Sequence, residues 1–221
     1  RQMNTMAETR EERQAKIIKQ YKDMCVIERD YAIQGFIHIA GVDEAGRGPL
    51  AGPVYAACVI IDPRRPLYGV NDSKRLSEKC RNALYDIIID RAAAYGIGSS
   101  DADIINQHGI MFALNKAMQT AIKQCSIQPD VVLLDGNIAF NIASKVEPIV
   151  RGDSRSASIA AASILAKVSR DREMLKYHEL YPQYNFAQHK GYGTPEHIAA
   201  LREYGLCPIH RERFCKTALS K

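Results

Sequence analysis

Four acidic side chains stand where apolar runs of the sequence end, and acids in such places can bind a metal ion. The four are Asp43, Glu44, Asp135 and Asp153. In an open α/β sheet, strand ends of this kind meet in one crevice, so we expect these carboxylates to lie close together. Their mutual repulsion would raise their pKa values, and a divalent cation relieves that repulsion. Ligands that are all oxygen favour Mg²⁺ or Mn²⁺ over zinc.

Each acid also has a purely structural interpretation. Asp153 could cap a helix that begins shortly after it, and Asp135 stands in an Asp-Gly dipeptide, which is common in turns. The adjacent pair Asp43 and Glu44 is harder to explain, because two neighbouring acids at a strand end face opposite sides and neither placement helps a core. The prediction of a metal site therefore depends on the combination.

The periodicity of apolar residues predicts the elements that would carry these acids. Runs typical of strands lie at residues 36–42, 54–61, 92–99, 131–134 and 146–150. Helical spacing is found at residues 8–33, 110–121 and 156–177, in a segment capped by Ser77 with Cys80 on its apolar face, and in a last helix between Thr194 and Gly205. This alternation predicts a mixed α/β sheet flanked by helices. We expect a helical extension at residues 1–35, a main domain at residues 36–221 and a C-terminal helical segment within it.

The composition excludes several classes of protein. With 46% hydrophobic and 25% charged residues, the 221-residue chain is typical of a globular domain. Its 30 Lys and Arg against 25 Asp and Glu leave a net charge of +5, which favours a polyanionic partner only weakly. The six cysteines form no CxxC pair and stand mostly among apolar residues, so we expect buried free thiols. No apolar run approaches the ~18 residues of a membrane span, and we expect a cytoplasmic protein that contacts no membrane.

A glycine-rich stretch follows the first acidic pair. Residues 46–51, GRGPLA, formally match the fingerprint of a dinucleotide-binding loop. That fingerprint needs a helix next, whereas prolines and a strand-like run follow here, and two acids before the glycines would repel a phosphate. We instead expect Gly46 and Gly48 to let the backbone approach a ligand, and Arg47 to contact a phosphate or a sugar.

The residues around these acids resemble the ribonuclease HII family, the type 2 ribonucleases H of bacteria. The stretch DEAGRGPLAGP at residues 43–53 is similar to the signature of that family. Five further segments are similar to family motifs and occur in the same order, at residues 71–77, 134–136, 151–154, 158–171 and 189–194. The resemblance covers about residues 36–205.

The resemblance implies a ribonuclease H-like fold and an endonuclease. Such an enzyme would hydrolyse the RNA strand of RNA–DNA hybrids and cut DNA duplexes at embedded ribonucleotides. The four family carboxylates carry over to Asp43, Glu44, Asp135 and Asp153, as catalytic residues and as ligands of two Mg²⁺ or Mn²⁺ ions. The products implied have 3′-hydroxyl and 5′-phosphate ends.

The resemblance also assigns substrate contacts. The Gly-Arg-Gly motif at residues 46–48 would read the ribose 2′-hydroxyl at an RNA–DNA junction. Tyr192 would stack on the neighbouring deoxyribose, although it could instead be a loop aromatic packed on the surface. Ser73 and Lys74 would hold a backbone phosphate. We expect the enzyme to act as a monomer.

Some residues depart from the family pattern or receive a structural interpretation. Arg151 stands where the family usually has lysine, and Arg213 where it often has serine, so the role of the tail is open. His189 is interpreted as structural. Lys167 and Arg170 could face a phosphate, but charges on a helix face of this kind are usually just solvated, and that is the expectation here.

Two other functions compete with this interpretation. A junction resolvase or transposase-type nuclease also uses clustered acids on a related sheet, but a DNA-only enzyme has no use for a sensor of the 2′-hydroxyl. A non-enzymatic RNA-binding module would need stacking aromatic residues, yet aromatics form only 7% of the chain and there is no Trp.

Overall fold

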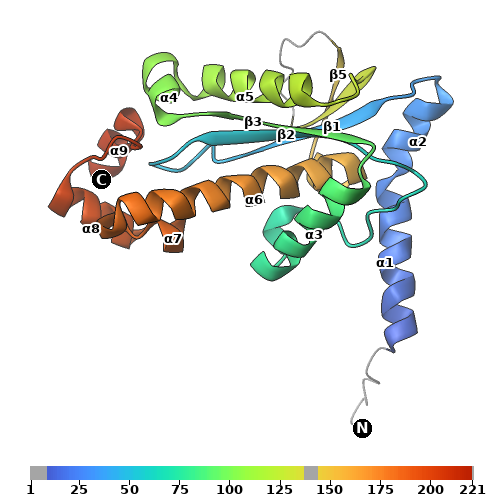
Figure 1. Ribbon diagram of the computed structural model, residues 1–221, viewed down its shortest axis with the longest axis horizontal. Helices are drawn as coiled ribbons and strands as arrows, with labels where there is room; N and C mark the ends of the chain where they lie inside the picture. Colours follow the sequence, from blue (N-terminus) through green and yellow to red (C-terminus); the bar gives the residue numbers. More distant parts are fainter. Residues whose placement is uncertain (1–8, 137–143, 221) are drawn as a thin grey trace.

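The computed structural model of the protein describes residues 9–136 and 144–220 and has a mixed sheet at its centre (Figure 1). The strand order is β3-β2-β1-β4-β5. β1 pairs antiparallel with β2 and parallel with β4, while β2–β3 is antiparallel and β4–β5 is parallel. The strands are β1 (Ile39–Ala45), β2 (Val54–Ile60), β3 (Ala94–Ser100), β4 (Val131–Asp135) and β5 (Lys145–Ile149). The predicted mixed α/β sheet is confirmed, with strand bounds that differ by a few residues.

Helices cover both faces of this sheet (Figure 1). One face carries α4 (Ala102–His108) and α5 (Ile110–Gln124), and the other carries α3 (Glu78–Arg91) and the long α6 (Ala157–Leu180). At the end of the sheet beyond the β1–β2 loop lie α7 (Phe186–His189), α8 (Pro195–Tyr204) and α9 (Glu212–Leu219). Three short 3₁₀ helices are η1 (Ser73–Arg75), η2 (Gly152–Ser154) and η3 (Pro182–Tyr184). Each sheet face buries its own apolar cluster against its helices, as a layered α/β domain requires.

A glycine in β1 sets the distance between the sheet and α6. A Cβ atom at Gly41 would overlap the backbone of Ser158 and Ile159. Only glycine therefore lets the first turns of α6 lie this close to β1. Since β1 also carries the first pair of acids, Gly41 brings the start of α6 next to the predicted metal site.

The N-terminal segment forms two helices, not the single helix predicted from its periodicity. These are α1 (Arg10–Met24) and α2 (Val26–Ile33), and the chain bends at Cys25, whose ψ is 6°. Tyr21 and Met24 are buried in the same cluster as Leu67. The division of the chain at residue 35 stays a prediction.

A buried acid ties α2 to the start of α6. Glu28 is 5% exposed, and its Oε1 accepts hydrogen bonds from Ser156 Oγ at 2.6 Å, Ser158 N at 2.9 Å and Ser158 Oγ at 2.7 Å. The same Ser156 caps α6 by accepting from the amide of Ile159. A carboxylate at a helix N-terminus is also favoured by the helix dipole.

Glu28→Ala is expected to lower the free energy of unfolding by about 2–4 kcal/mol, because it leaves three buried donors without their shared acceptor. Glu28→Gln keeps an oxygen acceptor and should cost less. Denaturant unfolding of both variants checks this, with Asp30→Ala on the exposed side of α2 as the control. A Glu28→Ala protein as stable as that control would contradict the expectation.

Several details of the sequence-based prediction are wrong. Gly205 does end α8, but α8 is not the last helix, because α9 follows. A cap signal for α9 is missing, since its N-cap residue Arg211 makes no side-chain capping bond. Cys80 is exposed rather than on an apolar face, while Cys58, Cys125 and Cys215 are buried free thiols as expected. Among the described helices, none has the length and apolarity that crossing a bilayer requires.

Candidate metal and substrate site

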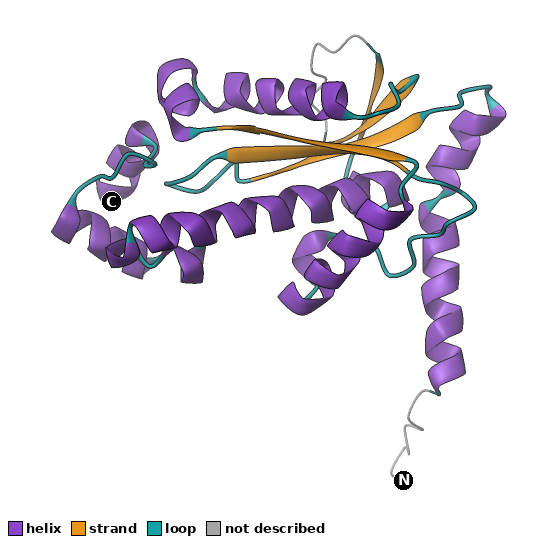
Figure 2. Cartoon of the chain, in the orientation of Figure 1, coloured by secondary structure: helices purple, strands orange, loops and turns teal. Residues whose placement is uncertain are grey.

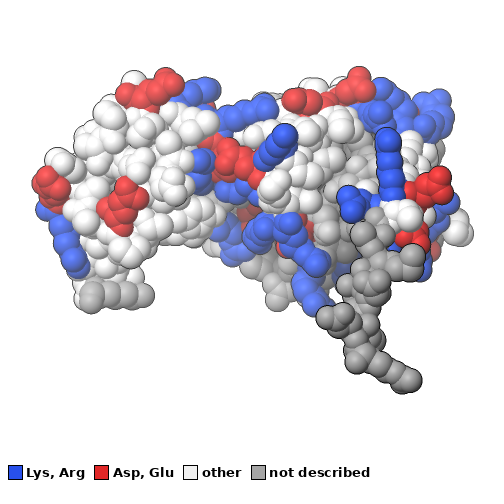
Figure 3. Space-filling view, turned by 90° about the horizontal axis from the view of Figure 1, so that it is seen from below, with Lys and Arg blue, Asp and Glu red and all other residues white. Residues whose placement is uncertain are grey.

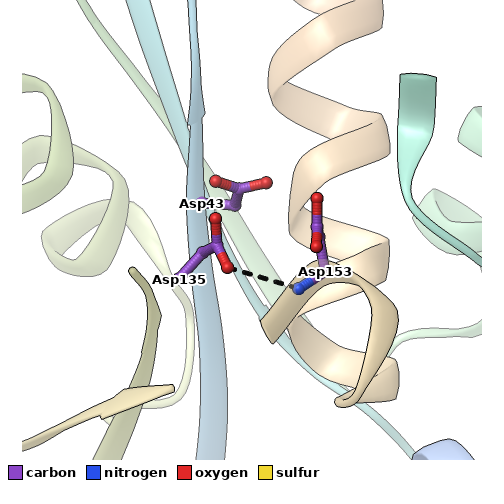
Figure 4. Close-up of side chains that lie close together, drawn as sticks. All are labelled: Asp43, Asp135 and Asp153. Atoms are coloured by element: carbon purple, nitrogen blue, oxygen red, sulfur yellow. Dashed lines mark hydrogen bonds between the residues drawn. The ribbon is translucent and has the colours of Figure 1, made fainter. Parts of the chain in front are cut away.

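Three of the predicted acids meet in one place (Figure 4). Carboxylate oxygens of Asp43, Asp135 and Asp153 all lie within 4.8 Å of one another. Asp43 is buried and the other two are half-buried. Oxygen atoms at this spacing fit a hard divalent cation such as Mg²⁺ or Mn²⁺, whose bonds to oxygen are short.

The topology of the sheet explains why these acids meet. β1 and β4 are parallel neighbours with Val42 opposite Leu134, so the next residues, Asp43 and Asp135, lie side by side. Asp135 Oδ1 also accepts hydrogen bonds from the amides of Gly152 at 2.6 Å and Asp153 at 3.4 Å. These bonds hold η2 against the strand end and bring Asp153 to the pair.

The capping interpretation of Asp153 does not hold. Ser156 is the N-cap of α6 and its side chain accepts from Ile159 N. The Asp153 side chain instead lies beside Asp43 and Asp135 (Figure 4). Its position is thus explained by the acid cluster.

The electrostatics of the site favour a cation. Burial raises the pKa of Asp43 well above its usual value, and the carboxylates of Glu44 and Asp135 raise it further. The pKa of Asp153 is also raised, first by burial and then by Asp135. A metal ion would offset this repulsion and let the acids stay ionised.

In the metal-free protein, Asp43→Asn is expected to be more stable than the wild type at about pH 8. Because the pKa of Asp43 is raised by folding, its contribution is fully present below the ordinary carboxyl range. It is lost as the pH rises through the raised pKa. Thermal unfolding in EDTA should therefore show wild type losing more stability than the variant between about pH 5 and about pH 8.

Mg²⁺ provides the control for this expectation. At the higher pH it should raise the melting temperature of the wild type more than that of Asp43→Asn, because binding stabilises the folded state. A stability difference in EDTA that does not change with pH would show that Asp43 titrates normally.

The structure does not place Glu44 in this three-acid cluster. Its side chain forms an ion pair with Arg47, with Nη1 3.4 Å from Oε1. Burial raises the pKa of Glu44, and the charges of Arg47 and Lys74 oppose that rise. Glu44 is therefore close to the site and to the glycine loop, and its role as a metal ligand stays a prediction.

The predicted phosphate contacts lie beside the acids but differ in exposure. Ser73 is buried, and its hydroxyl accepts a hydrogen bond from that of Ser163 on α6 at 2.9 Å. Ser163 also lowers the pKa of Asp43 against the effect of burial. Lys74 is exposed, and its positive charge lowers the pKa of Asp153, in opposition to burial and to Asp135, which raise it. Ser73 is thus bonded to α6 through Ser163, whereas Lys74 presents a cation at the edge of the site.

The glycine-rich loop joins β1 to β2 and reaches toward the C-terminal helices (Figure 2). The strand β2 follows this loop, whereas a dinucleotide-binding loop is followed by a helix. The dinucleotide-binding interpretation therefore fails, as the sequence indicated. Gly46 has a φ of +93° and no room for a Cβ, which would overlap the side chain of Arg170. At Gly48 a Cβ would meet nothing within 4 Å. The two glycines therefore differ, because Gly46 is required by packing and Gly48 is not.

Arg170 is buried, so the expectation of a solvated side chain is wrong. Its guanidinium donates to the carbonyl oxygens of Pro53 at 3.0 Å, Ala51 at 3.0 Å and Lys190 at 2.9 Å. It also lies 5.7 Å from the ring centroid of Tyr192. Arg170 thus joins the glycine loop to the loop that carries Tyr192. Lys167 is partly buried and pairs with Asp171 at 2.7 Å.

Tyr192 lies on a short loop next to the glycine loop, and its side chain is 43% exposed. The amide of Leu50 donates to Gly191 O at 2.8 Å, which joins the two loops directly. His189 is buried beneath, where its Nδ1 accepts from Gly191 N and its Nε2 contacts Tyr184 O. That is a structural position for His189, while the Tyr192 ring is open to a ligand.

Some residues that build this site were not found from the sequence. Ser163, Arg170 and Arg211 belong to this group, and so does Glu28. One signal was available, because Arg170 stands four residues after Ala166 and four before Met174, both of which are buried. Such spacing places a charged side chain on the inner side of a helix, where it must find partners.

Known proteins are similar to this chain over most of its length. The model of the family described as ribonuclease HII matches residues 40–217. Ribonuclease HII of Ruminiclostridium cellulolyticum is 50% identical over 199 residues, covering 90% of this chain and 78% of the relative. Ribonuclease HII 1 of Methylibium petroleiphilum is 57% identical over 175 residues, covering 79% and 88%.

Solved structures show the same fold. The crystal structure of ribonuclease H2 from Pyrococcus horikoshii is similar with a TM-score of 0.70 and 26% identity, covering 83% of this chain and 98% of that one. The three clustered aspartates and both loops lie inside the region that the family model matches.

Proposed function

This chain belongs to the ribonuclease HII family, and from that premise we propose which residues perform its reaction and which duplexes it cuts. It is a metal-dependent endonuclease of the ribonuclease H type that degrades RNA in RNA–DNA hybrids. We propose that it also cuts DNA duplexes at single embedded ribonucleotides. The observation that carries the proposal is the meeting of three aspartate carboxylates within 4.8 Å beside a glycine loop.

Asp43, Asp135 and Asp153 would hold the metal, with Glu44 as a further ligand from the same strand as Asp43. Two Mg²⁺ or Mn²⁺ ions, when bound, would lower the pKa of an attacking water molecule and stabilise the leaving oxygen. The protein residues hold the carboxylates in place and partly shield them from solvent, and the bound cations would keep them ionised. Hydrolysis of this kind leaves 3′-hydroxyl and 5′-phosphate ends.

The two loops would supply the selectivity for ribose. The Gly-Arg-Gly motif at residues 46–48 would read the 2′-hydroxyl, which RNA has and DNA lacks. Tyr192 would stack on the neighbouring deoxyribose, and Ser73 and Lys74 would hold a backbone phosphate. On the face shown in Figure 3, Lys and Arg side chains gather over the middle and the right, interspersed with Asp and Glu, and the basic groups could contact the phosphates of a duplex.

Cleavage mapping tests the proposal directly. A labelled RNA–DNA hybrid, a DNA duplex with one ribonucleotide and the all-DNA duplex are each incubated with Mg²⁺ or Mn²⁺. We expect cuts in the first two, none in the third, and no cleavage in EDTA. Cleavage of the all-DNA duplex would indicate a resolvase-type nuclease, and metal-independent binding without cleavage would indicate an RNA-binding module.

We also propose that the enzyme acts as a monomer. The three clustered aspartates lie together within one chain, and the glycine loop is bonded to the Tyr192 loop of the same chain. Sedimentation of the active protein at its assay concentration tests this, since a dimer would sediment with twice the mass.

Tyr192→Ala is expected to reduce kcat/KM for a single embedded ribonucleotide by roughly ten- to a hundredfold, the range that the loss of one stacking contact gives. Its melting temperature should stay close to that of the wild type, because the ring is 43% exposed. Equal activity of variant and wild type on that substrate would mean that Tyr192 is only a surface aromatic.

A further inference from the structure

We infer that the consecutive residues His210 and Arg211 are positioning residues that hold the two substrate loops at a fixed spacing. Arg211 orients the glycine loop, and His210 supports the Tyr192 loop through His197. The inference rests on the proposed function, because it assigns these loops to the recognition of ribose at the cleavage site. It gives the C-terminal segment a role in selectivity.

Arg211 is fully buried, and its guanidinium hydrogen-bonds the glycine loop. Its Nη2 donates to Gly46 O at 2.7 Å, its Nη1 to Arg47 O at 3.0 Å and its Nε to Gly52 O at 2.9 Å. Burial lowers the pKa of Arg211 to about 9, so the group still carries its charge at neutral pH. A buried cation that satisfies three carbonyls of one loop fixes the shape of that loop.

These bonds also orient the amide groups of the loop. In a trans peptide the C=O and the following N–H point in opposite directions, and no cis peptide is found in the described residues. Fixing the oxygens of Gly46 and Arg47 on Arg211 therefore turns the N–H groups of Arg47 and Gly48 away from it. Neither amide donates to a backbone carbonyl of the described residues. Two adjacent donors thus face outward, as recognition of a sugar hydroxyl requires.

The hydrogen bonds of His210 lead to the Tyr192 loop. Its Nδ1 accepts from Cys207 N at 2.8 Å, so in the neutral ring the proton is on Nε2. That Nε2–H donates to His197 Nε2 at 3.0 Å. The proton of His197 is then on Nδ1, which donates to Tyr192 O at 2.9 Å. Burial lowers the pKa of both His197 and His210 to about 4, so both rings are neutral at neutral pH.

The backbone closes the same connection. Arg211 N donates to Leu50 O at 2.8 Å, Leu50 N donates to Gly191 O at 2.8 Å, and Gly52 N donates to Ile209 O at 2.8 Å. The C-terminal segment, the glycine loop and the Tyr192 loop are therefore bonded pairwise or in series. This network is buried and its donors and acceptors are paired. A shift of one loop would therefore leave buried polar groups of the other segments without hydrogen-bond partners.

Binding measurements test whether Arg211 positions the glycine loop. The Asp43→Asn background with Mg²⁺ keeps the duplex uncut, and fluorescence anisotropy gives Kd for a DNA duplex with one ribonucleotide and for the all-DNA duplex. We expect Arg211→Lys, which cannot reach three carbonyls at once, to lower the preference for the ribonucleotide by roughly tenfold. Its affinity for the all-DNA duplex should stay unchanged.

A destabilised control separates positioning from general loss of stability. Leu114→Ala opens a cavity on α5, on the opposite face of the sheet from α6, and lowers stability without touching either loop. It should keep the preference for ribose. An Arg211→Lys protein that keeps the wild-type preference, or a Leu114→Ala protein that loses it equally, would overturn the inference.

A double-mutant cycle in the cleavage-competent enzyme tests the His210 arm. His210→Asn keeps an acceptor for Cys207 N but loses the bond to His197, and kcat/KM for the single ribonucleotide should fall roughly fivefold. In a Tyr192→Ala background the same change should have no further effect, because His210 acts through Tyr192. Additive losses would contradict that route.

The outcomes also distinguish this inference from the proposed function. A wild-type protein that neither cuts nor prefers the ribonucleotide duplex would overturn both. A wild type that cuts and prefers the ribonucleotide duplex would support the proposed function. If Arg211→Lys and His210→Asn then behaved like this wild type, only the positioning roles would be overturned.

Discussion

Asp43→Asn is expected to abolish cleavage of an RNA–DNA hybrid, lowering kcat by at least about a thousandfold, equivalent to about 4 kcal/mol of transition-state stabilisation. Asp43 is the buried member of the three-aspartate cluster and lies directly beside Asp135 in the sheet register. An amide has nearly the same shape but no charge, so it cannot offset the charge of a divalent ion. Initial rates on a labelled hybrid, over a range of Mg²⁺ and Mn²⁺ concentrations, check this.

A matched control comes from an acid of the same type far from the site. Asp103 is exposed on α4, and Asp103→Asn removes one negative charge without touching the cluster. It should cleave at close to the wild-type rate. If Asp43→Asn retained a tenth or more of the wild-type rate, the assignment of this cluster as the catalytic metal site would be wrong.

Gly48→Ala is expected to lower kcat/KM for a single embedded ribonucleotide by at least about a hundredfold, with little change in stability. In the free protein a Cβ at Gly48 meets nothing within 4 Å, so the folded state has room for it. In the proposed complex, the same methyl group would stand between the loop and the ribose. A clash of that kind removes both the close approach and the hydrogen bond, and each is worth about 1–3 kcal/mol.

Gly46→Ala provides the contrast for this prediction. Its φ of +93° disfavours any side chain, and its Cβ would overlap Arg170, so both stability and activity should fall. Thermal unfolding and steady-state cleavage of the two variants separate the cases. A Gly48→Ala enzyme with full activity would mean that the loop does not approach the ribose at this residue.

Much of the fold follows from local patterns. The five strands and the long helix α6 show apolar runs with clear periods, and the structure contains all of them. Short elements such as α7 and α9 were missed, because a helix of a few residues has little periodicity and is stabilised by its neighbours. The bend at Cys25 was missed because no glycine or proline marks it.

The three aspartates were also accessible to sequence reasoning. Each ends an apolar segment, and the parallel pairing of β1 with β4 brings such ends together. Glu44 was predicted by the same reasoning, and its role as a metal ligand stays a prediction. Glu44 directly follows Asp43 at the same strand end. Its side chain nevertheless pairs with Arg47, because successive residues of a strand face opposite sides.

The sequence by itself determined the kinds of chemistry available to this protein: oxygen ligands for a metal, and a glycine loop able to approach a sugar. Only the tertiary structure decided which groups support them. Arg211 could not be distinguished from a solvated arginine, since a charged side chain is buried only where distant carbonyls meet it. Gly46 and Gly48 are the same residue type, and only the tertiary structure separates them, because Gly46 alone has a positive φ and packs against Arg170. Local sequence encodes periodicity and side-chain chemistry, whereas burial and partnership arise from segments that are far apart in the chain.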